Sequence, residues 1–189
     1  MAHKTLKDLF IAELRDMYDA EHRLTKILPK FAKASNSPEL ATAFRAHLDQ
    51  TEQHVTRLET VMEMVDQSPK RKTCHAMVGL IEEAQDLMHQ EGSANLCDAA
   101  LIAAALKIEH YEMATYLSLR GWVDVMKSAP ATKLIQKTLD EETMAIQGLT
   151  RISQSLQLDW LGEGEEDEMA EATVNSGSES VSLKKPRTK

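Results

Sequence analysis

Apolar residues recur at helical spacing in four long stretches of this chain, and few residues interrupt them. The 189 residues include only seven glycines and five prolines, and the breaks gather at Ser35–Pro38, Gly92–Ser93 and Ser128–Pro130. Such spacing is typical of helices with one buried face. It predicts long helices over residues 5–34, 38–66, 94–126 and 131–156, and a shorter helix over 76–90. We therefore expect an all-α four-helix bundle whose short fifth helix lies in the crossover between two helical hairpins.

Local signals at the helix starts agree with these boundaries. Thr5 is followed three residues later by Asp8, which is the spacing of a capping pair. Ser37 precedes Pro38, which favours an N-cap followed by proline in the first helical position.

Composition excludes several classes of protein. Hydrophobic residues make up 42% of the chain but aromatics only 4%, so the core must be mostly aliphatic. The formal net charge of -8 argues against a nucleic-acid partner for the bundle. No apolar run is long enough to cross a membrane, and the N-terminus lacks a signal-peptide pattern. The two cysteines are too few for a disulfide framework. We expect a cytoplasmic protein.

The sequence changes character after Trp160. Residues 162–189 are acidic, then rich in serine, then basic, and offer little to bury. This composition predicts a disordered charged tail after a helical domain at residues 1–161. The basic end could contact nucleic acid or an anionic surface, but a solvated tail is the favoured interpretation.

Each long helix carries a glutamate in a slot of its apolar stripe: Glu21, Glu52, Glu109 and Glu142. In the third, Glu109 lies among Leu106, Met113 and Leu117. Burying an unpaired carboxylate costs several kcal/mol unless a cation, a hydrogen bond or a metal offsets the cost. Asp49 and Glu112 each place a second acid one helical turn from a first. The pattern predicts carboxylates that converge in the core.

Converging carboxylates are suited to a pair of iron or manganese ions. In this hypothesis Glu52 and Glu109 bridge the ions, Glu21 and Glu142 are terminal ligands, and Asp49 and Glu112 are further candidates. The usual pattern places a histidine three residues after the glutamate on two helices. Here Asp49 is followed by Glu52 and Glu109 by Glu112, while Ala145, three residues after Glu142, cannot bind a metal.

A second interpretation needs no metal. The inward acids could pair with lysine, arginine or the tyrosines Tyr18, Tyr111 and Tyr116. His47 and His54 are the nearby imidazoles on the second helix, and they follow a border of its stripe together with Thr51. For both, as for His110, a structural or surface role is the favoured interpretation.

Five blocks of the sequence resemble the YciE/YciF family of ferritin-like stress proteins over about residues 4–158. The blocks are LRDMYDAEHRLTKILPKFAKA, AFRAHLDQTEQHVTRLE, AMVGLIEEA, DAALIAAALKIEHYEMATY and LIQKTLDEET. The resemblance implies a ferritin-like bundle, often dimeric, with a di-iron centre and a ferroxidase-like role.

By position, Glu21, Glu109, Glu112 and Glu142 match the family's acids, whereas the block HLDQTEQH shows a departure. Asp49 stands where members commonly have glutamate, and Ile146 where aspartate is common. These departures weaken a site. They leave open an alternative, a non-catalytic stress-associated scaffold with a degenerate metal site.

Overall fold

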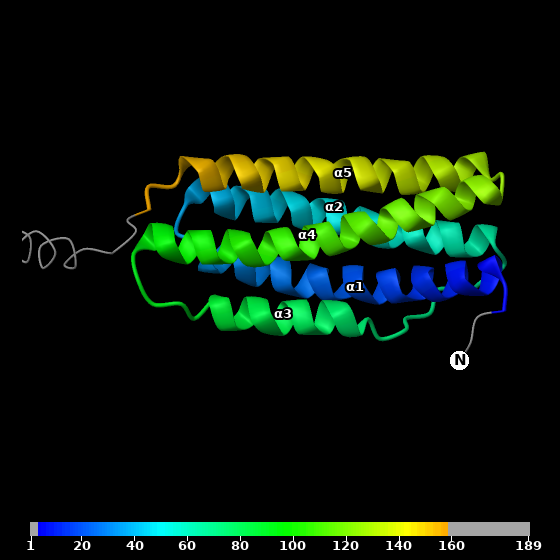
Figure 1. Cartoon of the computed structure of the whole chain (residues 1–189), viewed down its shortest axis with the longest axis horizontal. Coiled ribbons are helices and arrows are strands. Elements are labelled where there is room, and N and C mark those ends of the chain that lie inside the picture. Colours follow the sequence, from blue (N-terminus) through cyan, green and yellow to red (C-terminus); the bar gives the residue numbers. More distant parts are fainter. Residues whose placement is uncertain (1–3, 159–189) are drawn as a thin grey trace, which may run out of the picture. The chain divides into compact units, whose positions relative to one another are not determined.

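The computed structural model describes residues 4–158, and within them it contains five α-helices and no strand. The expected all-α fold is confirmed, with every predicted helix present in order (Figure 1). The helices are α1 (Leu6–Ala34), α2 (Pro38–Met64), α3 (His75–Leu87), α4 (Ala94–Val125) and α5 (Ala129–Ser155).

Two helical hairpins build the bundle. Short connections join α1 to α2 and α4 to α5, and each pair packs along its length. Contacts of α2 with α5 and of α1 with α4 close the four helices around one core. The short helix α3 lies in the crossover from α2 to α4 and packs on α4 and α1 (Figure 1). A four-helix core of this kind brings side chains from all four long helices to its centre.

Side-chain caps begin most of the helices where the sequence indicates. Thr5 accepts a hydrogen bond from the backbone N–H of Asp8, whose carboxylate accepts from the N–H of Thr5, so the predicted capping pair is present. Ser37 and Ser93 cap α2 and α4 in the same way. These contacts satisfy backbone donors that the helix itself leaves free.

Asp98 fastens the start of α4 to the turn between α1 and α2. Its side chain accepts the backbone N–H groups of Asn36 at 2.8 Å and of Ser37 at 2.7 Å, and it is only 2% exposed. We expect Asp98→Ala to lower the free energy of unfolding by about 2–4 kcal/mol, because two backbone N–H groups of the turn lose their charged, buried acceptor. Urea unfolding measures this loss. Asp49→Ala, at an exposed position, should change stability by less than about 0.5 kcal/mol; similar losses in both variants would contradict the assignment.

The core faces of α2 and α4 differ in part from the predicted ones. In α2 the predicted apolar residues Leu40, Phe44, Val55, Leu58 and Met62 are buried. The centre of the buried face, however, runs through His47, Thr51 and His54, so Glu52 is exposed beside it. In α4, Leu117 is 53% exposed. That helix contacts α1, α3 and α5, so its apolar residues spread over several faces and give a weak stripe.

The predicted charged tail at residues 162–189 lies outside the described residues, so its disorder stays a prediction. Among the helices within residues 4–158, none combines the length and the apolar character that a membrane crossing requires. The cytoplasmic location stays a prediction.

Candidate metal centre

Six buried histidine and glutamate side chains meet in the middle of the bundle. None is more than 6% exposed, although all six are ionisable. They come from all four long helices: Glu21 from α1, His47 and His54 from α2, Glu109 and Glu112 from α4, and Glu142 from α5. Each of these residues occupies a position on its helix where an apolar residue would otherwise fill the core.

The six residues form two groups that share Glu142. In the first group, one potential ligand atom from each of His47, Glu109, Glu112 and Glu142 lies within 4.8 Å of the others. In the second, Glu21, His54 and Glu142 satisfy the same limit. Because the shared carboxylate has two oxygens, it can contribute to both groups at once.

The shared carboxylate indeed divides its oxygens between the two histidines. Oε1 of Glu142 lies 3.0 Å from Nδ1 of His54, and Oε2 lies 3.7 Å from Nε2 of His47. The same His54 nitrogen is 3.4 Å from Oε1 of Glu21, and the His47 nitrogen is 3.2 Å from Oε1 of Glu109. Each oxygen of Glu142 thus faces a different histidine, so the carboxylate could contribute one oxygen to each group.

Hydrogen bonds leave most of these polar atoms unsatisfied. Within the described residues, nine buried side-chain nitrogen and oxygen atoms lack a hydrogen-bond partner, and eight of the nine belong to the six residues of this centre. Both oxygens of Glu112 are among them, whereas the oxygens of Glu142, Nε2 of His47 and Nδ1 of His54 make only the ion-pair contacts given above. Buried polar groups rarely stay unpaired, and each exception calls for an explanation. Concentration in one cluster points to a missing ligand.

The electrostatics of the metal-free centre oppose the charge states that metal ligands need. Burial lowers the pKa of both histidines, but the neighbouring carboxylates outweigh it. The charges of Glu109 and Glu142 raise the pKa of His47 to about 9. Those of Glu21 and Glu142 raise the pKa of His54 to about 11. Without a metal, protonated imidazoles thus serve as the cations of this core.

The protonated histidines do not stabilise all the buried glutamates equally, as Glu109 and Glu112 show. Burial raises the pKa of Glu109, but the charge on His47 outweighs burial and brings the pKa below its usual value. Burial raises the pKa of Glu112 well above its usual value, and the charges of Glu21, Glu142 and Glu109 raise it further. Glu112 therefore retains its proton at pH values at which Glu109 is ionised.

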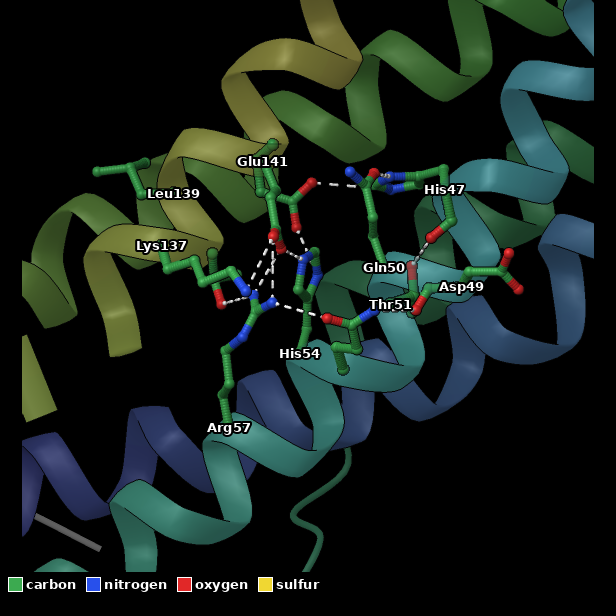
Figure 2. Close-up of polar contacts among 12 residues, drawn as sticks. His47, Asp49, Gln50, Thr51, His54, Arg57, Lys137, Leu139 and Glu141 are labelled. Carbon is green, nitrogen blue, oxygen red and sulfur yellow. Dashed lines mark hydrogen bonds and ion pairs between the residues drawn. The ribbon is translucent and has the colours of Figure 1, made fainter. Parts of the chain in front are cut away.

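A second layer of polar residues orients His54. Its Nε2 lies 3.0 Å from Oε2 of Glu141, and Arg57 donates to both oxygens of that carboxylate, at 2.5 and 3.1 Å (Figure 2). Arg57 also donates to Thr138 at 3.0 Å. Burial raises the pKa of Glu141, but Arg57 and His54 outweigh it and lower the pKa. A carboxylate on the far ring nitrogen is a common partner of metal-binding histidines because it fixes the ring orientation.

Tyr116 is the one tyrosine of the three considered that reaches the centre. Its hydroxyl donates to Oε1 of Glu21. Tyr18 instead donates to Glu59, and Tyr111 to Asp16. The expected pairing of inward acids with tyrosine is thus present for Glu21.

The predicted positions of Asp49 and Glu52 are wrong. Both side chains are exposed, and Figure 2 shows Asp49 directed away from His47 and His54. Glu52 therefore cannot bridge ions in the core, and the short reach of Asp49 has no bearing on the centre. His47 and His54, for which sequence analysis favoured a structural or surface role, take the core positions on α2. The signal was present, because the steps of four and three residues from His47 through Thr51 to His54 follow a helix face.

Comparisons with known proteins agree on one family. Residues 5–159 match the family described as a domain of unknown function, DUF892. The chain belongs to this family. The resemblance to YciE/YciF proteins noted in the sequence is confirmed, since Protein YciF of Escherichia coli K12 is 43% identical over 143 residues, which cover 75% of this chain and 86% of that protein.

Solved structures of the family share the fold. The crystal structure of the E. coli stress protein YciF matches with a TM-score of 0.77 and 41% identity, over 80% of this chain and 96% of that one. A protein described as "YcfI, a putative structural protein from Rhodopseudomonas palustris" matches with a TM-score of 0.76 and 32% identity, over 82% and 96% of the two chains. The bundle is thus the common architecture of these relatives.

Proposed function

We propose that this protein binds two transition-metal ions, iron or manganese, in the core of its bundle and that it acts in a stress response. The observation that carries the proposal is the cluster of eight buried atoms without a hydrogen bond, on six residues from four helices. His47, Glu109, Glu112 and Glu142 would hold one ion, and Glu21, His54 and Glu142 the other. The role in stress rests on YciF, which is described as a stress protein.

The donor set fits this class of metal. Carboxylate oxygens and imidazole nitrogens suit iron and manganese, whereas sites for structural zinc commonly use thiolates. Both cysteines lie elsewhere: Cys74 caps α3, and Cys97 contacts backbone oxygens near Gly92. Two divalent cations would also replace the protons that the buried histidines and Glu112 otherwise retain.

Bound iron would supply redox chemistry toward oxygen or peroxide, which is the basis for expecting a ferroxidase-like activity. The chain contributes the environment. Its carboxylates would neutralise the ions, Glu141 and Arg57 hold the His54 ring, and aliphatic core residues surround most of the centre. Ligands placed on four rigid helices also limit how far the two ions can separate.

Metal analysis tests the proposal directly. Protein purified without chelator and then loaded anaerobically with Fe2+ should retain about two ions per chain, as the two ligand groups predict. Anomalous scattering at the iron edge in loaded crystals should place both ions beside Glu142. Retention of no iron and no manganese above background after loading would overturn the proposal.

Removal of the outer carboxylate should weaken one ion site. Glu141→Ala leaves the far nitrogen of His54 without its acceptor, so we expect metal affinity at the Glu21–His54 group to fall about 10- to 100-fold. Titration with Mn2+ followed by electron paramagnetic resonance measures the affinity. Asp140→Ala is the matched control, because Asp140 precedes Glu141 on α5 but is exposed. Equal affinities in the two variants would show that Glu141 does not support the ligand.

A non-catalytic structural role is the competing function. It is favoured by the description of YcfI as a putative structural protein at 32% identity. Under that role the protein would gain no stability from metal, and the six buried residues would be satisfied by protons and by one another. Homodimer formation also stays a prediction, which light scattering of the purified protein would measure.

A further inference from the structure

A cavity of about 180 Å³ lies between α2 and α5 and reaches the first ligand group. At its outer end are Ala46 and Met144, whose side chains are exposed. At its inner end are His47 and Glu109, which are buried and each carry an atom without a hydrogen bond. The cavity therefore connects the surface with the centre.

The sequence of α5 leaves this space open. Ala145 lines the cavity three residues after Glu142, at the position where bundles of this type usually carry a histidine ligand. Gly148, one turn further along the helix, lines it as well. An ion held by His47 and Glu109 would thus lack a protein ligand on the side that faces the cavity.

The walls select for uncharged molecules. Apart from His47, Glu109 and Gln50, the lining consists of alanine, glycine, phenylalanine, methionine and leucine. Such walls cannot replace the water shell of a metal ion, whose transfer to an apolar environment is strongly unfavourable. Apolar cavities of about this size do take up xenon and small hydrocarbons.

We propose that this cavity is the route by which a small uncharged molecule, of the size and polarity of dioxygen, reaches the ion at His47 and Glu109. This inference rests on the proposed metal centre and adds a substrate class and an entry path. Access passes between α2 and α5, and Gly148 and Ala145 set the width of the path.

Glycines on α5 and α4 allow a cavity-filling variant and a matched control. A Cβ at Gly148 would meet no atom within 4 Å, so a side chain can begin there without a clash, and leucine is the variant chosen to fill the cavity. Ala145→Leu narrows the same path from the adjacent turn. Gly121 on α4 is also helical with no atom within 4 Å of an added Cβ, and it does not line the cavity. Gly121→Leu therefore controls for the gain in helix propensity that follows loss of glycine.

The test combines a structural and a kinetic measurement. Metal-free crystals under xenon pressure should show xenon in the cavity of the wild type and of Gly121→Leu, but not of Gly148→Leu. In Fe2+-loaded protein under anaerobic conditions, nitric oxide serves as an uncharged diatomic probe, and stopped-flow absorbance gives its binding rate. We expect that rate to fall at least tenfold in Gly148→Leu and Ala145→Leu and to stay unchanged in Gly121→Leu, with equal iron content in all four proteins.

The outcomes separate the two proposals. Full iron content with an unchanged rate in both cavity variants would overturn the entry path and leave the metal centre intact. Absence of xenon from the wild-type cavity would also overturn the path. Failure of every protein to retain iron would overturn the metal centre, and the entry path with it.

Discussion

Replacement of Glu112 by glutamine should make the metal-free protein more stable at pH 7, by about 1–3 kcal/mol. Both oxygens of Glu112 are buried and unpartnered. Burial and then the charges of Glu21, Glu142 and Glu109 raise its pKa well above the usual value. Glutamine keeps the shape of the side chain but has no charge to bury. Urea unfolding in the presence of EDTA measures the difference, and Glu52→Gln at an exposed position is the control.

The sign of the pH dependence follows from the raised pKa. Well below pH 4.5 the carboxyl is protonated in both the folded and the unfolded chain, so it causes no pH-dependent loss of stability. As the pH rises above the ordinary value of 4.5, the unfolded chain releases this proton while the folded chain retains it. The wild type should therefore lose stability relative to Glu112→Gln from about pH 4.5 up to the raised pKa.

Bound metal should reverse the relative stability of the wild type and Glu112→Gln. An ion beside His47, Glu109 and Glu142 would favour the ionised form of Glu112, so the wild type would gain stability that Glu112→Gln cannot gain fully. We expect the wild type to be the less stable protein in EDTA and the more stable one with saturating Mn2+. Lower stability of Glu112→Gln in EDTA would mean that Glu112 already has a partner in the folded protein.

The helices could be predicted from the sequence because their boundaries depend on local signals. Capping residues such as Thr5 and Ser37, and breaks at Gly92 and Pro130, act over a few residues. Glu21 and Glu142 were placed correctly in the core because clear aliphatic stripes flank them on α1 and α5. Where the stripe is aliphatic, its period identifies the buried face.

The centre could be predicted only in part because its polar residues disrupt the pattern that locates a core. On α2 the buried face carries His47, Thr51, His54 and Arg57, which a hydrophobic count assigns to the surface. Leu48 is half-buried beside this face, and Glu52 follows it by four residues. Because Leu48 was counted as a core residue, the helical spacing placed Glu52 in the core as well. The identity of a partner on another helix, such as Glu142 beside both histidines, is a long-range property that spacing within one helix cannot supply.

Replacement of Glu142 by glutamine should abolish the stabilisation that metal gives the wild type. At a metal concentration of 100 times Kd, a site specific to the folded state adds about 2.7 kcal/mol. For a domain of this size that is a rise in Tm of about 5–10 °C. Because Glu142 belongs to both ligand groups, Glu142→Gln should lose the rise entirely. Differential scanning calorimetry with and without Mn2+ measures it, and Glu52→Gln should keep the full rise.

The pattern of metal content distinguishes a shared ligand from two independent sites. Glu112 belongs only to the first group and Glu21 only to the second. Glu112→Gln and Glu21→Gln should therefore each lose one ion, whereas Glu142→Gln should lose both. Metal content after gel filtration measures the loss, and circular dichroism checks that each variant is folded. If Glu142→Gln lost no more metal than Glu21→Gln, the carboxylate would not be shared, and the two groups would have to be treated as separate sites.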